Sequence, residues 1–248
     1  MKLLYATNLK ENALSSGLIE SMLVLRRVGL KNIVFLQTDA SKDWFGNMSI
    51  QGISSSLLIE KELSLPWILS VAEKGNVSLI VVNLDGGARN PSRSSLIKDL
   101  MRRSPVPVLI TNGTAAAGKG LFEHVVFATD WSPASEKALT YLLGFREILG
   151  ELDIVNVIKG KLTLKDMRDL KERLAHTRKR CLNEKIDAES HIYAGKTSEE
   201  IITASRDYRA TLIVLGAISK KPVYKEIFGA GSSHRVAAEA AVPVLVVP

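Results

Sequence analysis

Three short apolar runs occur twice along the chain, in the same order. The matched pairs, first copy before second, are LLYATN (3–8) and VVFATD (125–130), LIVVN (79–83) and LIVLG (212–216), and PVPVLIT (105–111) and AVPVLVV (241–247). The spacing between matched positions grows from 122 residues at Thr7 and Thr129 to 136 residues at Pro107 and Pro243. A constant order with growing spacing is typical of two diverged copies with insertions. The sequence therefore predicts a tandem repeat.

The runs consist of Val, Ile and Leu without polar alternation, which is typical of strands buried on both faces of a parallel sheet. Segments with helical periodicity lie between them. In the second copy the predicted order is strand 124–129, helix 133–149, strand 152–158, helix 163–184, strand 188–194, helix 197–208, strand 211–216, helix 232–241 and strand 243–247. This alternation predicts an α/β fold with two tandem, doubly wound, five-stranded parallel-sheet domains.

The first copy follows the same plan with one gap. Residues 41–56 predict a loop, which is followed by a short strand within 57–63 and a helix at 66–75. Nothing in the first copy corresponds to the long charged helix at 163–184. This missing helix accounts for most of the growth in spacing.

A stretch rich in Gly and Ala separates the copies. We place the domains at 1–112 and 123–248, joined by a linker at 113–122. Residues 113–119 (GTAAAGK) also have the spacing of a phosphate-binding P-loop. Such a loop continues with Ser or Thr into a helix, whereas Gly120 and then a strand follow here. The linker interpretation is therefore favoured.

Composition excludes several classes of protein. No run of 18 apolar residues exists and the N-terminus turns polar at once, so we expect a cytoplasmic protein with no membrane partner. The single cysteine, Cys181, excludes an intramolecular disulfide and fits a reducing compartment. Its basic neighbours would lower the thiol pKa, but an inert thiol is the favoured interpretation.

The net charge of +7 would suit binding to nucleic acid. However, only 6% of residues are aromatic and the basic residues fall on predicted helix faces, so nucleic acid is not favoured as a partner.

Candidate chemistry gathers in the second copy. Ligands of open parallel sheets bind beyond the carboxyl ends of the strands, where the strand order reverses. Asp130 follows the first strand, Gly216 ends the fourth, and GAGSS (229–233) opens the last helix. A carboxylate accepts hydrogen bonds from sugar hydroxyls, while glycines and a helix N-terminus can hold a phosphate. The alternative is that the glycines form turns and that Asp130 and Ser132 cap a helix.

These residues resemble the signature of the universal stress protein family, through ATDWSPASEKAL (128–139), LIVLGA (212–217) and the Gly-Ser loop before PVLVV. The resemblance covers the second copy and, more weakly, the first. It implies the Usp fold (adenine nucleotide alpha hydrolase-like), with the copies packed as an internal pseudo-dimer through strands 106–111 and 243–247. It also implies ATP or AMP as ligand, with Mg²⁺ accompanying ATP.

The resemblance assigns roles to ten positions. Asp130 would meet the ribose, and Ala128 and Val157 would border adenine. Leu215 and Gly216 would lie beside the nucleoside. The positions near the phosphates would be Ser219, Gly229, Gly231, Ser232 and Ser233.

Two departures from the family pattern G-x-x-G-x9-G-[ST] leave nucleotide binding open. Ser219 replaces the second glycine and Ala230 takes the place of Ser or Thr. The first copy departs further, because Asn8 replaces the aspartate and Asn83 the strand-end glycine. The first copy is therefore interpreted as a scaffold.

Catalysis has little support in the sequence. The four histidines form no triad or metal-ligand spacing with Asp, Glu or Cys, and His234 alone lies near the expected phosphates. We predict no catalytic residue, no metal site, and at most slow ATP hydrolysis.

The leading hypothesis for the function is a nucleotide-binding regulator of stress response. The alternatives are a protein-interaction module that binds no nucleotide and a weak nucleotide hydrolase or transferase. A further homodimer, and unidentified protein partners, also stay open.

Overall fold

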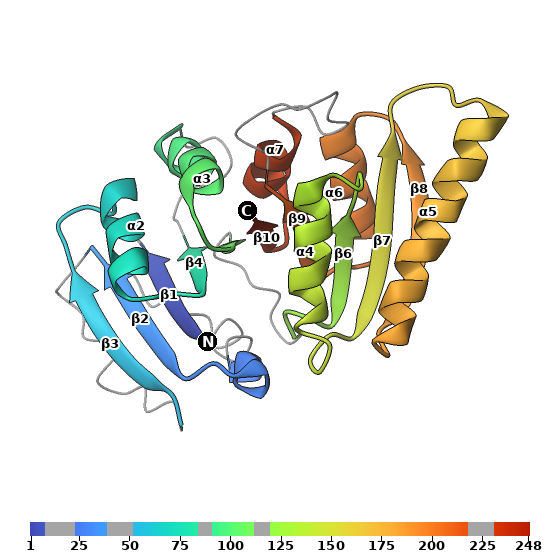
Figure 1. Cartoon of the computed structure of the whole chain (residues 1–248). Coiled ribbons are helices and arrows are strands. Elements are labelled where there is room, and N and C mark those ends of the chain that lie inside the picture. Colours follow the sequence, from blue (N-terminus) through green and yellow to red (C-terminus); the bar gives the residue numbers. More distant parts are fainter. Residues whose placement is uncertain (8–22, 39–51, 84–90, 112–119, 218–230) are drawn as a thin grey trace.

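The structure is a computed structural model that describes residues 1–7, 23–38, 52–83, 91–111, 120–217 and 231–248 (Figure 1). The elements of the first half are β1 (Lys2–Thr7), the 3₁₀ helix η1 (Leu25–Val28), β2 (Asn32–Gln37), β3 (Ser54–Ile59), α2 (Leu65–Lys74), β4 (Leu79–Asn83), α3 (Pro91–Arg103) and β5 (Val108–Thr111). Those of the second half are β6 (His124–Ala128), α4 (Pro133–Leu143), β7 (Glu151–Ile158), α5 (Leu164–Asn183), β8 (Asp187–Ala194), α6 (Thr197–Asp207), β9 (Leu212–Gly216), α7 (Ser232–Glu239) and β10 (Val244–Val247).

Most predicted elements of the second half are confirmed to within two residues at each end. The helix predicted at 133–149 is an exception, because α4 ends at Leu143. Gly144 follows, and its N–H bonds to the carbonyl oxygen of Tyr141, so the chain leaves the α-helix through tighter turns. Glycine has a low helix propensity, which explains the earlier end.

The short strand of the first half was predicted too late in the chain. It spans Ser54–Ile59 and so begins inside the predicted loop 41–56. The main chain of Ser54–Ser56 pairs in parallel with residues 32–34 of β2. Because β3 lies at the edge of the sheet, its exposed serines need no apolar partner, and the apolar pattern therefore failed to mark them.

The ten strands of the described residues form one sheet in the order β3-β2-β1-β4-β5-β10-β9-β6-β7-β8. The same order thus occurs twice, read outward from the centre. β5 and β10 pair antiparallel, with Val108 opposite Val246 and Ile110 opposite Val244. This confirms the expected pairing of the final strands. All other pairs are parallel, so the carboxyl ends of the two halves lie at opposite edges of the sheet.

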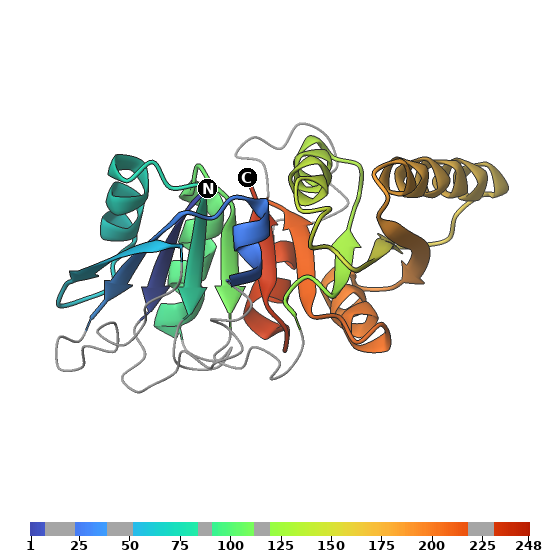
Figure 2. The same ribbon diagram turned by 90° about the horizontal axis from the view of Figure 1, so that it is seen from below.

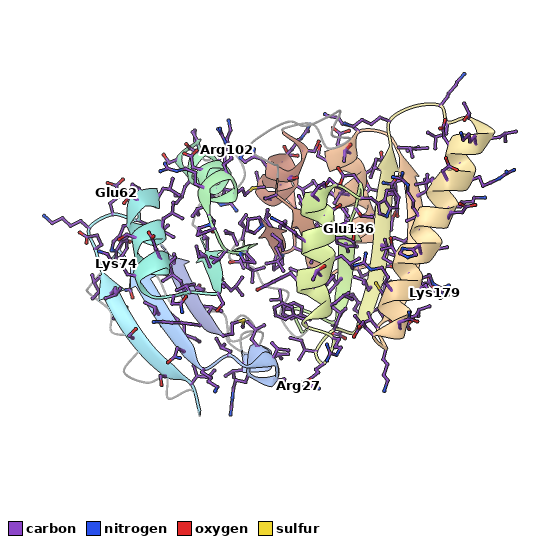
Figure 3. The ribbon with its side chains drawn as sticks, viewed as in Figure 1. Arg27, Glu62, Lys74, Arg102, Glu136 and Lys179 are labelled. Atoms are coloured by element: carbon purple, nitrogen blue, oxygen red, sulfur yellow. The ribbon has the colours of Figure 1, made fainter. Side chains whose placement is uncertain are left out.

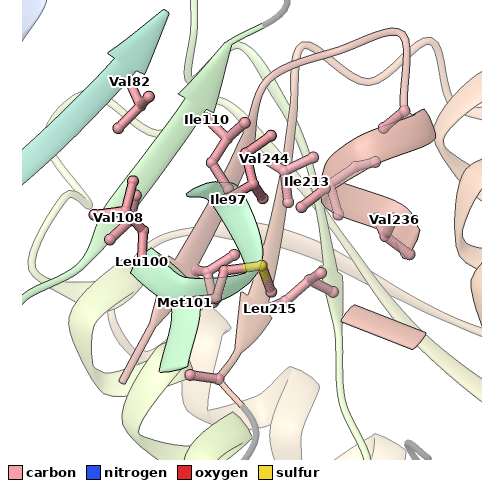
Figure 4. Close-up of a cluster of buried hydrophobic side chains, with 14 of the residues drawn as sticks. Val82, Ile97, Leu100, Met101, Val108, Ile110, Ile213, Leu215, Val236 and Val244 are labelled. Atoms are coloured by element: carbon pink, nitrogen blue, oxygen red, sulfur yellow. The ribbon is translucent and has the colours of Figure 1, made fainter. Parts of the chain in front are cut away.

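Helices cover both faces of the sheet (Figure 2). One buried apolar cluster includes side chains of α2, α3, α6 and α7, and a second includes side chains of η1, α4 and α5. The first cluster crosses the junction of the halves, where Ile97 and Met101 of α3 share the core with Val236 of α7 (Figure 4). Each fully buried side chain of this size contributes about 1.5–3 kcal/mol, so the junction is part of the core.

Three helices begin at a polar side chain that accepts a main-chain hydrogen bond. Ser64 accepts from the N–H of Trp67, and Ser132 accepts from the N–H of Ser135. Thr163 and Asp166 form a reciprocal capping box at the start of α5. Such caps contribute about 1 kcal/mol each and fix where the helices start.

The junction between the predicted domains is described only in part. Residues 113–119, including the P-loop-like spacing, lie outside the described residues. Phe122 is buried and its ring stacks on Phe145, with 5.1 Å between the ring centroids. This part of the predicted linker therefore packs against the second half.

Many basic side chains lie on the outer surfaces of helices, as the sequence predicted, although Arg93 of α3 is buried. Figure 3 shows Lys74 on α2, Arg102 on α3 and Lys179 on α5, and all three are exposed. None of the helices in the described part of the chain is long and apolar enough to cross a membrane.

The Cys181 thiol is fully buried against the sheet. Burial raises its pKa to about 11, and Arg180 only partly offsets this. The lowered pKa that the basic neighbours suggested is therefore wrong, and the interpretation as an inert thiol is favoured by the structure.

We expect native Cys181 to resist Ellman's reagent at pH 8. With a pKa of about 11, about one thiol in a thousand is ionised at that pH, and packing hinders the reagent further. Absorbance at 412 nm should show one thiol per chain in guanidinium chloride and a far slower reaction without it. Equal rates in the two conditions would contradict the burial.

Candidate functional site

The candidate site lies at the carboxyl edge of the second half, where three adjacent strands end. β6 pairs in parallel with β9 on one side and with β7 on the other. Ala128 ends β6, Gly216 ends β9, and Val157 is the penultimate residue of β7. The order of the strands reverses between β6 and β9, so Asp130 follows β6 at the position where ligands of such sheets bind.

The side chains of three predicted site residues face the core. Ala128, Val157 and Leu215 are 1%, 1% and 3% exposed and belong to the apolar cluster that α6 and α7 cover. Because these side chains are buried in the core, a ligand at the strand ends would contact their main-chain atoms instead. The structure thus gathers these residues at one edge, while their expected contact with adenine stays a prediction.

The Asp130 carboxylate is bonded to its own turn. Its Oδ1 accepts a hydrogen bond from the N–H of Ser132 at 3.0 Å, and Ser132 in turn caps α4. Asp130 and Ser132 therefore form the hydrogen bonds at the start of α4 that the capping alternative predicted. Among the described residues no other hydrogen bond or ion pair reaches Asp130, so Oδ2 can accept from a ligand.

Packing among the described residues requires glycine at position 216 but not at position 231. A Cβ on Gly216 would lie 2.5–2.7 Å from main-chain atoms of Ala134 and Ser135, because the first turn of α4 rests on this strand end. A Cβ on Gly231 would meet no described atom within 4 Å. Packing thus requires glycine at the end of β9, whereas Gly231, just before α7, is exposed and sterically open.

The helix that follows Gly231 has no side-chain cap at its N-terminus. Its first residue, Ser232, is half-buried and Ser233 is buried. Because α7 leads from the carboxyl end of β9 back to the start of β10, its first main-chain N–H groups belong to the same edge as Asp130. Ser219, Gly229 and Ala230 lie outside the described residues.

His234 lies at the junction of the halves. Its Nε2 is 3.1 Å from the carbonyl oxygen of Ser94 and 3.2 Å from the Ser94 hydroxyl, both on α3. Nε2 of His234, the histidine that the sequence places near the expected phosphates, is therefore engaged by the other half.

The first half closes the corresponding strand end with a side chain. Asn83 takes the position of Gly216, and its Nδ2 donates to the hydroxyl of Tyr5 at 3.0 Å. Both residues are fully buried, and burial raises the pKa of Tyr5 to about 12. In the second half Phe127 matches Tyr5 and lacks the hydroxyl, so the pair exists in one half alone. Asn8 and residues 84–90 lie outside the described residues.

A cavity of about 510 Å³ adjoins the candidate site and was missed by the sequence analysis. Its lining consists of Trp131, residues 156–162, Asp166, Asp169, Leu170 and Arg173. Trp131 has a φ of 56°, and its Nε1 donates to the hydroxyl of Thr177 on α5 at 3.0 Å. The Arg173 guanidinium lies 5.7 Å from the centre of the indole ring. The one signal in the sequence was Asn156, a polar residue in an apolar strand, which bonds to the carbonyl oxygen of Thr129.

The fold brings His191 close to two carboxylates that the spacing along the sequence did not connect with it. Its Nε2 lies 2.9 Å from Oδ1 of Asp153 and 4.0 Å from Oε2 of Glu189. Burial raises the pKa of Asp153, and the hydrogen bond with His191 opposes this. The sequence hid the cluster because Asp153 belongs to β7 while the other two residues belong to β8.

Comparison with known proteins identifies relatives of this fold. The model of the universal stress protein family matches residues 121–248. Among solved structures, a universal stress protein from Archaeoglobus fulgidus is 22% identical with a TM-score of 0.71, over 99% of this chain and 95% of that chain. A putative universal stress protein from Pseudomonas aeruginosa is 15% identical with a TM-score of 0.70, over 99% and 92%. At such identities these likenesses show the fold alone. No curated protein matches the sequence.

Exchanging each of the two glycines for alanine should show which of them the packing requires. Gly216→Ala forces the first turn of α4 to move, which costs about 1–3 kcal/mol. For a chain of this size each kcal/mol lowers Tm by about 2–4 °C. Gly231→Ala meets no described neighbour, so its Tm should stay within about 1 °C of wild type. Circular dichroism melts of both variants measure this, and equal losses of Tm would contradict the contrast.

Proposed function

The chain belongs to the universal stress protein family, and on this premise we propose that it binds ATP or AMP at the carboxyl edge of its second half and acts as a regulator in stress response. The observation that carries the proposal is the position of Asp130 at the strand-order reversal, beside the end of β9. A cytoplasmic location belongs to the same proposal, since the single cysteine suits a reducing compartment.

The ribose fits the free side of the Asp130 carboxylate. Oδ1 is held by the N–H of Ser132, which orients the carboxylate, and Oδ2 is left to accept from sugar hydroxyls. A hydrogen bond to a charged group contributes about 1.5–3 kcal/mol. Asp130 should therefore supply a large part of the affinity for a nucleoside.

The phosphates fit the start of α7. No side chain of the described residues caps this helix, so its first N–H groups can bond to an anion. Gly231 places no side chain in the way, and the hydroxyls of Ser232 and Ser233 belong to the same turn. A helix N-terminus carries positive potential, which favours phosphate. Mg²⁺ would enter with the phosphates of ATP.

The base fits the region between the end of β7 and Trp131. Val157 and Ile158 line the 510 Å³ cavity, whose volume is within the range of small-molecule sites. Adenine placed there would remain close to Asp130, because Trp131 is the next residue in the chain.

We propose one nucleotide per chain. In the first half, the buried amide of Asn83 and the hydroxyl of Tyr5 occupy the matching strand end. Displacing them would leave buried polar groups without partners, at a cost of about 1–3 kcal/mol for each group. The first half then serves as a scaffold.

A second candidate function is protein interaction without nucleotide. It is favoured by the Asx turn at Asp130, which explains that residue by local structure alone, and by Ser219 and Ala230 in the family pattern. We propose no catalytic residue under either candidate.

Calorimetric titration of the wild-type chain with AMP and with ATP plus Mg²⁺ should show one site per chain. Asp130→Ala should weaken binding by about 10- to 100-fold, from the loss of a charge-assisted hydrogen bond. The matched control is Asn8→Ala, at the equivalent position of the first copy, which should bind as wild type does.

The two candidate functions predict opposite results. If millimolar AMP or ATP produces neither heat nor a rise in Tm with the wild-type chain, the nucleotide proposal fails and the interaction module is the better description. Equal losses in Asp130→Ala and Asn8→Ala would place the site elsewhere.

A further inference from the structure

We propose that Asp153, Glu189 and His191 bind a divalent transition-metal ion, for which Zn²⁺ is the expected type. The cluster lies on β7 and β8, on the face of the sheet that α6 covers (Figure 1). It lies nearer the amino ends of these strands, away from the carboxyl edge proposed for the nucleotide. The proposal therefore does not rest on the proposed function.

The ligand atoms are already close together. Nε2 of His191 and the nearest carboxylate oxygens of Asp153 and Glu189 lie within 4.8 Å of one another. Zn²⁺ binds nitrogen and oxygen ligands at about 2.0–2.2 Å, so three such donors lie about 3–4 Å apart around the ion. A rotation of the Glu189 side chain, which is 72% exposed, closes the remaining distance. The ion would replace the hydrogen bond between Asp153 and His191.

The strand pairing brings these side chains to one face. Asp153 is opposite Glu189 in the parallel register, and His191 follows Glu189 by two residues. Residues two apart on a strand point to the same side, so the register itself determines the cluster. Sites on paired strands hold their ligands more precisely than loops do.

The imidazole is held in place by an aromatic ring. Tyr208 stacks on His191 with 4.3 Å between the ring centroids and 28° between the planes. Tyr208 also forms the C-cap of α6, whose carboxyl end carries the negative end of the helix dipole. The stacking fixes the orientation of the His191 imidazole, and the helix dipole favours a cation beside it.

The surrounding charge is strongly negative. A cavity of about 270 Å³ beside the cluster is lined by Leu152, Tyr208 and four acidic residues, namely Glu151, Asp153, Asp187 and Glu189. Within the described part of the chain, no lysine or arginine forms an ion pair with any of these four carboxylates. Their basic partners among the described residues are histidines, His191 for two of them and His124 for Glu151 at 2.9 Å. A divalent cation would neutralise negative charge that no lysine or arginine of the described residues balances.

The donor set selects the class of metal. One imidazole and two carboxylates suit Zn²⁺, Co²⁺ or Mn²⁺, whereas Mg²⁺ and Ca²⁺ prefer oxygen ligands throughout. Three protein ligands leave a fourth tetrahedral position for water. The site would therefore hold an exchangeable ion with an open coordination position.

The test is calorimetric titration of tag-free protein with Zn²⁺, in the absence of nucleotide. We expect one ion per wild-type chain. Glu189→Gln and His191→Gln should each weaken binding at least tenfold, since even groups outside the ligand shell change metal affinity 10- to 100-fold. The matched control, His176→Gln, removes a histidine outside the cluster and should keep wild-type affinity.

Titration with Co²⁺ gives a second readout. The wild-type chain should develop visible d–d absorption bands, and His191→Gln should lose them. Wild-type protein that binds neither ion, or equal affinity in wild type, Glu189→Gln and His191→Gln, would overturn the proposal. If circular dichroism shows that His191→Gln does not fold, Glu189→Gln decides, because its side chain is largely exposed.

Discussion

The antiparallel pairing of β5 with β10 is the contact on which the rest of the molecule depends. It joins two parallel sheets into one and places α3 beside α7, so that the apolar core runs through the junction. It also turns the carboxyl ends of the halves toward opposite edges. Each half must therefore build any ligand site from its own strands, and the halves can diverge in function without disturbing each other.

The divergence is visible at two matched strand ends. In the second half Gly216 lets the first turn of α4 rest on the strand, which brings Asp130 and the cap of α4 to the same edge. In the first half Asn83 and Tyr5 fill the matching position with a buried hydrogen bond. One strand end is thus covered by a helix turn, and the other by a side-chain hydrogen bond. The asymmetry of the repeat is thus a matter of packing as well as of lost ligand groups.

β7 connects the two places where we propose that ligands bind. At its carboxyl end, Asn156 and Val157 border the cavity next to Trp131. Nearer its amino end, Asp153 meets His191 of β8. Polar residues are rare in a strand that is buried on both faces, because each needs a partner. Asp153 bonds to His191 and Asn156 bonds to the carbonyl oxygen of Thr129. Each of the two polar residues lies at a place where we propose that a ligand binds.

The order of strands and helices, the family and the position of Asp130 could be read from the sequence alone. Buried parallel strands are short local runs of Val, Ile and Leu, and helix starts carry their own caps, so these features depend on neighbours in the chain. The start of the edge strand β3 was predicted too late because exposed serines have no such pattern. Only the tertiary structure decided the packing role of Gly216 and the meeting of Asp153 with His191, 38 residues further along. Such contacts depend on strand register and on where a helix comes to rest, and neither is encoded by adjacent residues.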